Sequence, residues 1–81
     1  MNWRDHIAVE PNINHGQACL IGTRVLVAVV LDNLAAHVSP EEIMRSYPSV
    51  TAEGIDACIA YAAELARERV IALPSDSVHA V

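Results

Sequence analysis

Histidine and cysteine are the residues of this chain best able to bind a metal or attack a substrate, but their spacing favours neither. Cys19 and Cys58 lie far apart and form no CxxC pattern, and the histidines lack the i, i+4 spacing that places two ligands on one helix face. No serine or cysteine lies beside an obvious His and Asp pair, and no glycine-rich phosphate loop is present. We therefore predict reduced, apolar thiols, no metal or other cofactor, no catalytic residue and no small-molecule substrate. The chain is not expected to be an enzyme.

The segment Gly22-Thr23-Arg24 could bind an anion. A glycine turn ahead of a helix can expose backbone amides, and Thr23 and Arg24 would add a hydroxyl and a guanidinium. The same residues are also compatible with a structural turn, in which Thr23 caps locally and Arg24 pairs with an acid such as Asp5 or Glu10. Both interpretations are open at the level of sequence.

Arg45 and Thr51 flank a short turn where a helix-turn-helix protein would meet the DNA backbone. The helix after this turn would then present its exposed face to the bases. That face is acidic and rich in alanine, and its residues are Glu53, Asp56, Ala57, Ala60 and Glu64. Phosphates repel such a face, so we do not expect the chain alone to bind DNA with sequence specificity.

Acids on this last helix could instead bind a basic protein partner. The candidates are Glu53, Asp56, Glu64 and Glu68, although the same residues could simply form a solvated helix face. Trp3, the only tryptophan, could anchor an interface or cover the small core.

Composition supports a protein partner over a nucleic acid. Of 81 residues, 53% are hydrophobic and 19% charged, which excludes a disordered acidic tail. The net charge is −5 and all five basic residues are arginine, so no basic stripe is available for phosphates. The apolar excess over what so small a core can bury predicts a partner surface, most simply a homodimer. No long apolar run and no secretion signal are seen, so we expect no membrane association and a cytoplasmic location.

Local signals place these residues on a short ribbon and three helices. Strands are expected at residues 6–9 and 18–21, joined by a turn-rich loop. A helix should follow Arg24 and end near His37, and its apolar stripe contains Val27, Val30, Leu31, Leu34, Ala35 and Val38.

The remaining two helices are marked by their caps. Ser39 should cap a short helix over about residues 40–46 in a capping box with Glu42, and Pro48 should stop it. Thr51 should cap the last helix, in which Gly54 is a local defect. Its buried stripe is expected to contain Ile55, Cys58, Ile59, Ala62, Leu65 and Ala66.

These elements predict a mainly α fold, with a three-helix, helix-turn-helix (homeodomain-like) core and a short N-terminal β-ribbon. Residues 1–74 would form a single small helical domain and residues 75–81 a frayed C-terminal tail.

An ordered set of motifs resembles a known family. The set runs from Ile21-Gly22-Thr23-Arg24 through Ser39-Pro40-Glu41-Glu42-Ile43 to Tyr47-Pro48. In this order it resembles the small bacterial proteins catalogued as domain of unknown function 433, over roughly residues 6 to 70. The chain departs from the usual pattern at Gly16-Gln17-Ala18, where the family usually has Gly-Lys-Pro, and at His37, where it usually has Gly. The missing lysine removes a possible anion contact, and His37 is expected in a left-handed C-cap conformation.

The resemblance implies a homeodomain-like fold with an N-terminal ribbon and a role as the antitoxin of a toxin–antitoxin pair, beside a PIN-like nuclease. Our leading hypothesis is therefore a non-enzymatic antitoxin-like protein that binds a basic PIN-like toxin directly. The alternative is a helix-turn-helix transcriptional regulator in which Arg24, Arg45 and Thr51 contact phosphates, mainly as part of a complex.

Overall fold

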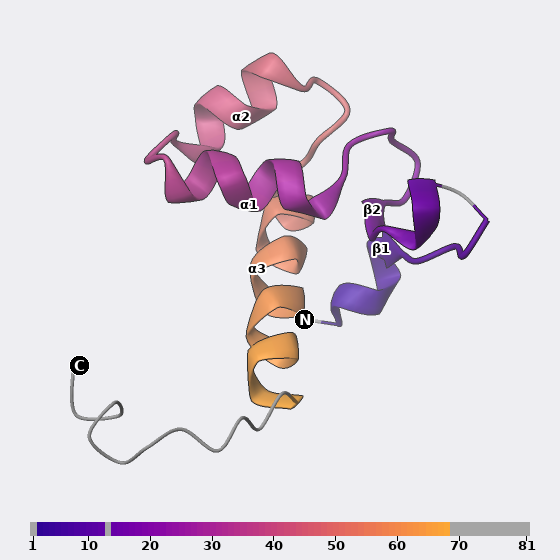
Figure 1. Ribbon diagram of the computed structural model, residues 1–81. Coiled ribbons are helices and arrows are strands. Elements are labelled where there is room, and N and C mark those ends of the chain that lie inside the picture. The colour runs from indigo at the N-terminus through magenta and orange to yellow at the C-terminus, as the bar shows by residue number, and fades with distance from the viewer. Residues whose placement is uncertain (1, 13, 69–81) are drawn as a thin grey trace, which may run out of the picture.

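Three helices and a two-stranded antiparallel ribbon make up the computed structural model, which describes residues 2–12 and 14–68 (Figure 1). The helices are α1 (Val27–Ala35), α2 (Pro40–Ser46) and α3 (Ala52–Glu68). The strands β1 (Ile7–Ala8) and β2 (Cys19–Leu20) are accompanied by two single 3-10 turns, η1 (Trp3–Asp5) and η2 (Asn14–Gly16). The predicted mainly α fold with an N-terminal ribbon is confirmed. No helix in the described ranges has the length and hydropathy needed to cross a membrane.

The ribbon is shorter than the sequence predicts, and β2 is its centre. Ile7 is paired with Leu20 and Ala8 with Cys19. On its other edge, β2 lies against the chain that enters α1, where the Leu20 amide donates to the Val25 carbonyl at 3.0 Å. The prediction of helix directly after Arg24 is therefore wrong by two residues, because Leu26 is extended and α1 begins only at Val27. Leu26 forms a bridge with Cys19, and the Val25 carbonyl accepts from Leu20, so both residues are held beside β2.

His37 takes the left-handed conformation expected of a residue in the usual glycine position, with φ of 66°. The amides of His37 and Val38 donate to the carbonyls of Leu34 and Asn33, both at 3.0 Å. This pair of bonds is a Schellman motif, which satisfies carbonyls at the end of α1 and turns the chain toward α2.

The predicted caps of α2 and α3 are formed. The Ser39 hydroxyl accepts from the Glu42 amide at 3.2 Å, and Pro40 occupies the first turn. The Thr51 hydroxyl accepts from the Gly54 amide at 3.0 Å. In the described residues, only the Ser39 half of the predicted capping box is formed. α2 begins at Pro40 and ends at Ser46, as the sequence predicts.

The core lies where the three helices meet the ribbon. Its most deeply buried large side chains are Val30, Ile43, Ile55 and Cys58, and Leu20 and Ile7 add the inner face of the ribbon. The predicted phase of α3 is wrong at four positions: Ala57, expected on the exposed face, is fully buried, whereas Ile59, Leu65 and Ala66, expected in the buried stripe, are exposed. The helix is rotated so that Ala57 packs inward, where its small side chain allows close contact.

Two predicted features lie wholly or partly beyond this description. Of the predicted domain over residues 1–74, the structure describes residues 2–12 and 14–68, and the predicted tail at 75–81 lies entirely outside the described residues.

Candidate functional site

The most specific motif of the sequence forms a tight turn between β2 and α1. Gly22 has φ of 80°, a backbone conformation that side chains with a Cβ rarely adopt. The Thr23 hydroxyl donates to the Leu20 carbonyl at 2.8 Å and accepts from the Val25 amide at 3.0 Å. Thr23 therefore caps the turn, and its proton is not available to an anion while the turn is intact.

Three hollows open around this turn, which we call the Gly22 turn (residues 21–24). The first, of about 510 Å³, lies over the ribbon and is lined in part by Glu10, Cys19 and Arg24. The second, of about 790 Å³, lies between the turn and the end of α2, and its lining includes Leu26, Val29, Tyr47 and Ser49. The third, of about 320 Å³, lies between the turn and the start of α3.

The first hollow contains both charges of a predicted ion pair that is not formed. Glu10 and Arg24 both line it, but the one ion pair within residues 2–12 and 14–68 joins Arg4 to Glu64. The predicted pairing of Arg24 with Asp5 or Glu10 is therefore wrong, and Arg24 is exposed to solvent. Cys19 is a free, half-buried thiol whose Sγ lies 3.3 Å from the Val25 carbonyl oxygen, so it helps to hold the turn.

The third hollow differs from the first in its charge, because its acid, Glu53, is accompanied by no arginine, whereas Arg24 lines the first hollow together with Glu10. Glu53 lines it together with the hydroxyl residues Thr23, Ser49 and Thr51, and Ile21, which is 55% exposed, also contributes. The Thr51 oxygen is already an acceptor in the cap of α3. Carboxylate and hydroxyl oxygens beside an apolar surface are suited to an arginine or lysine side chain.

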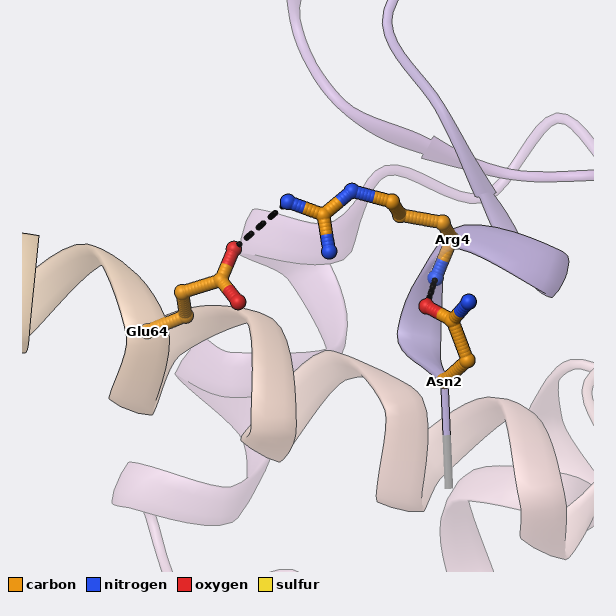
Figure 2. A network of polar contacts seen from close by, with 3 residues as sticks. All are labelled: Asn2, Arg4 and Glu64. Carbon is orange, nitrogen blue, oxygen red and sulfur yellow. Dashed lines mark hydrogen bonds and ion pairs between the residues drawn. The ribbon is translucent and has the colours of Figure 1, made fainter.

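The predicted acidic set is divided by the structure. Glu53 and Asp56 are exposed near the start of α3. Glu64 accepts from the Arg4 guanidinium at 3.1 Å, and Figure 2 shows this contact between α3 and the N-terminal turn. Glu68 ends α3, and its side chain lies outside the described residues. Glu53 and Asp56 thus lie near the start of α3, while Glu64 forms an ion pair with Arg4 of the same chain.

Trp3 covers the core beside this ion pair. Its ring meets Tyr61 edge to face at a centroid distance of 4.8 Å, and the Arg4 guanidinium lies 4.4 Å from the Trp3 ring centre. The Asn2 side chain accepts from the Arg4 amide at 3.1 Å (Figure 2) and so fixes the turn that presents both side chains. The indole Nε1 is buried without a hydrogen-bond partner among the described residues. The geometry matches the interpretation of Trp3 as a cover over the core, and a role in binding stays a prediction.

Arg45 is exposed in the last turn of α2 and lines none of the three hollows. Sequence reasoning missed the second hollow, because its walls come from segments on either side of α1 and α2. It also missed the exposure of Leu65, which is 40%. The sequence signal for the turn around which the hollows lie is Gly22, because glycine is the residue that most readily takes a positive φ.

The chain belongs to the family described as "Protein of unknown function (DUF433)", whose model matches residues 7–62. The matched segment contains the ribbon, the Gly22 turn with its hollows, α1, α2 and most of α3. It does not contain Trp3, Arg4 or Glu64, so the contact between the N-terminal turn and the end of α3 is outside the part that defines the family. No curated protein and no solved structure matches the chain.

Proposed function

We propose that this chain is a non-enzymatic, antitoxin-like protein of a toxin–antitoxin pair, and that it neutralises a PIN-like nuclease in the cytoplasm by direct binding. The observation that carries the proposal is the third hollow, where Glu53 and three hydroxyl residues lie beside the exposed Ile21. This combination is suited to an arginine or lysine of the partner, whose apolar stem can pack on Ile21 while its charged end meets Glu53.

Charge supports the same kind of partner. The chain carries −5 overall, and one of its five arginines, Arg4, is already paired with Glu64. A nuclease binds RNA through a positively charged groove, and an acidic protein that covers this groove is attracted to it and excludes the RNA. Inhibition then requires only that this chain cover the RNA-binding groove of the nuclease, and this chain catalyses no reaction.

A helix-turn-helix regulator is the second candidate. The capped turn between α2 and α3 favours it, together with the exposure of Arg24 and Arg45. The exposed Glu53 and Asp56 at the start of α3 oppose it, because a recognition helix inserts this end into the major groove, where the surrounding phosphates repel carboxylates. We therefore expect DNA binding, where it occurs, to require the toxin complex.

The test starts from the protein encoded beside this chain, which the proposal expects to be a small basic PIN-like nuclease. Tagged wild-type chain, co-expressed with that protein, should retain it on purification and relieve its toxicity. Glu53→Arg should reduce both effects, because it reverses the charge in the third hollow. Asp32→Arg is the matched control, since Asp32 is an exposed acid in α1 that lines none of the three hollows.

Two results would contradict the proposal. The first is a neighbour that is not retained by the wild-type chain and whose toxicity is unchanged. The second is a gel shift in which the purified chain alone binds its own promoter with steep salt dependence, which would favour the regulator.

A further inference from the structure

The second hollow, of about 790 Å³, is lined mainly by apolar side chains that the fold leaves half-buried. Val25, Leu26 and Val29 line it where α1 begins, and Tyr47 lines it at the end of α2. A group that filled the hollow would remove more of this apolar surface from water. The hollow therefore favours an apolar group.

Charge distinguishes the second hollow from the other two. Arg24 lines it and no acidic residue does, whereas Glu10 lines the first hollow and Glu53 the third. Arg24 is exposed and has no ion-pair partner in the described parts of the chain. The hydroxyl residues Tyr47 and Ser49 line the same hollow and add two possible donors. One guanidinium and two hydroxyls beside apolar side chains are suited to a carboxylate whose neighbour is apolar.

The residues around the second hollow are held in place by the backbone. The Tyr47 amide donates to the Ile43 carbonyl at 2.8 Å, and the Tyr47 carbonyl accepts from the Val50 amide at 2.9 Å. On the other side, the two hydrogen bonds of the Thr23 hydroxyl fix the turn that presents Arg24. A ligand therefore meets a preformed surface, and binding requires little ordering of this chain.

The second hollow continues into the third, since Thr23 and Ser49 line both. It is open to solvent, whereas a pocket for a free small molecule usually buries most of its ligand. An open surface with neighbouring hollows is better suited to a peptide segment that lies across it and places its side chains in successive hollows.

We propose that the second hollow docks a peptide segment of a partner protein, in which a large apolar residue stands beside an aspartate or glutamate. The apolar side chain packs against Leu26, Val29 and Tyr47, and the carboxylate meets the Arg24 guanidinium. This site does not depend on the proposed antitoxin role. Its test uses this chain alone, so a negative result leaves the proposed binding of a nuclease at Glu53 untouched.

The first experiment uses three capped dipeptides that separate the charge from the apolar side chain. Acetyl-Leu-Asp-amide carries both, acetyl-Leu-Asn-amide lacks the charge, and acetyl-Ala-Asp-amide lacks the large apolar group. Binding is followed by the amide NMR shifts of the isotopically labelled chain. The first dipeptide should bind with a dissociation constant on the order of 1 mM and shift the amides around the hollow, at residues 22–26, 29, 47 and 49. The other two should each bind at least about threefold more weakly.

The second experiment tests the charge of the hollow. Arg24→Gln should make the aspartate and asparagine dipeptides bind equally, because it removes the cation that distinguishes them. Arg45→Gln is the matched control and should preserve the difference, since Arg45 is exposed but lines none of the three hollows. The amide spectrum of each variant shows that its fold is intact.

A further probe, isocaproate, carries the apolar group and the carboxylate without a peptide. If it bound as tightly as acetyl-Leu-Asp-amide, the hollow would be a site for a free acid, and the proposal of a peptide would be overturned. The proposal is also overturned by shifts that lie elsewhere or do not occur, by equal binding of the three dipeptides, or by equal effects of Arg24→Gln and Arg45→Gln.

Discussion

Alkaline pH should weaken this fold through one buried thiol. Cys58 lies on the inner side of α3 with no exposed surface, and burial raises its pKa from an ordinary 9.0 to about 11. Burial has this effect because a thiolate in an apolar core loses its hydration. The unfolded chain, by contrast, releases the same proton near pH 9.

The size of the effect follows from this difference of about two pH units. Between pH 9 and 11 the unfolded chain binds fewer protons than the native chain, so the free energy of unfolding falls as the pH rises. Each pKa unit corresponds to about 1.4 kcal/mol, so the complete loss is about 3 kcal/mol. Below pH 9 the thiol is protonated in both states and contributes no slope. A domain of this size is only marginally stable, so a loss of 3 kcal/mol is large.

Urea denaturation at pH 7, 9, 10 and 11 under reducing conditions measures this slope. The comparison is between the wild type and Cys58→Ala, which retains both tyrosines, all arginines and Cys19. The other titrating groups therefore cancel in the difference between the two proteins. Cys58→Ala should be less stable at pH 7, because it leaves a small cavity, and this disadvantage should shrink or reverse by pH 11.

A difference in unfolding free energy that stays constant from pH 7 to 11 would refute the reasoning. It would mean that the Cys58 thiol titrates in the native state as it does in the unfolded chain, so that burial in the core does not protect it.

Backbone geometry leads to further predictions that thermal unfolding can check. His37→Gly should stabilise the chain by about 0.5–1 kcal/mol, because glycine removes the strain of a φ of 66° at the end of α1; an unchanged or lower melting temperature would contradict this. Gly54→Ala should stabilise α3 by a similar amount, since the added Cβ meets the Thr51 hydroxyl at 3.4 Å and Leu20 at 3.5 Å, both ordinary contacts, and alanine favours the helix by about 1 kcal/mol. Gly22→Ala is the contrasting change: nothing lies within 4 Å of the added Cβ, yet the φ of 80° should make it destabilising by about 1 kcal/mol. Equal shifts for the two alanine variants would show that φ does not decide their effect.

Features set by neighbours in the sequence could be predicted, and features set by distant ones could not. Ser39 and Pro40 locate the start of α2 because a cap needs only the next three residues. The left-handed His37 follows in the same way from its place after α1. The phase of α3 was not predictable to the same degree, because its apolar residues extend around more of the helix than the core covers. Ala57 and Ile59 exchange their expected places for this reason.

In the candidate site, too, contacts between sequence neighbours could be predicted and contacts between distant segments could not. The local cap by Thr23 is within the reach of sequence reasoning, because its partners are two and three residues away. The third hollow is not, since it combines the Gly22 turn with the start of α3. The contact between Arg4 and Glu64, which are 60 residues apart, likewise depends on how the N-terminal turn packs against α3.

We propose that the hollow beside Glu53 binds a basic nuclease and thereby blocks RNA. RNA cleavage by the PIN-like nuclease that the proposal expects to be encoded beside this chain, measured while the purified chain is added, tests this most directly. We predict that the wild-type chain stops cleavage near one chain per nuclease, and that Glu53→Arg requires at least about tenfold more protein. Cleavage that continues in excess wild-type chain, or equal inhibition by wild type and Glu53→Arg, would contradict the account.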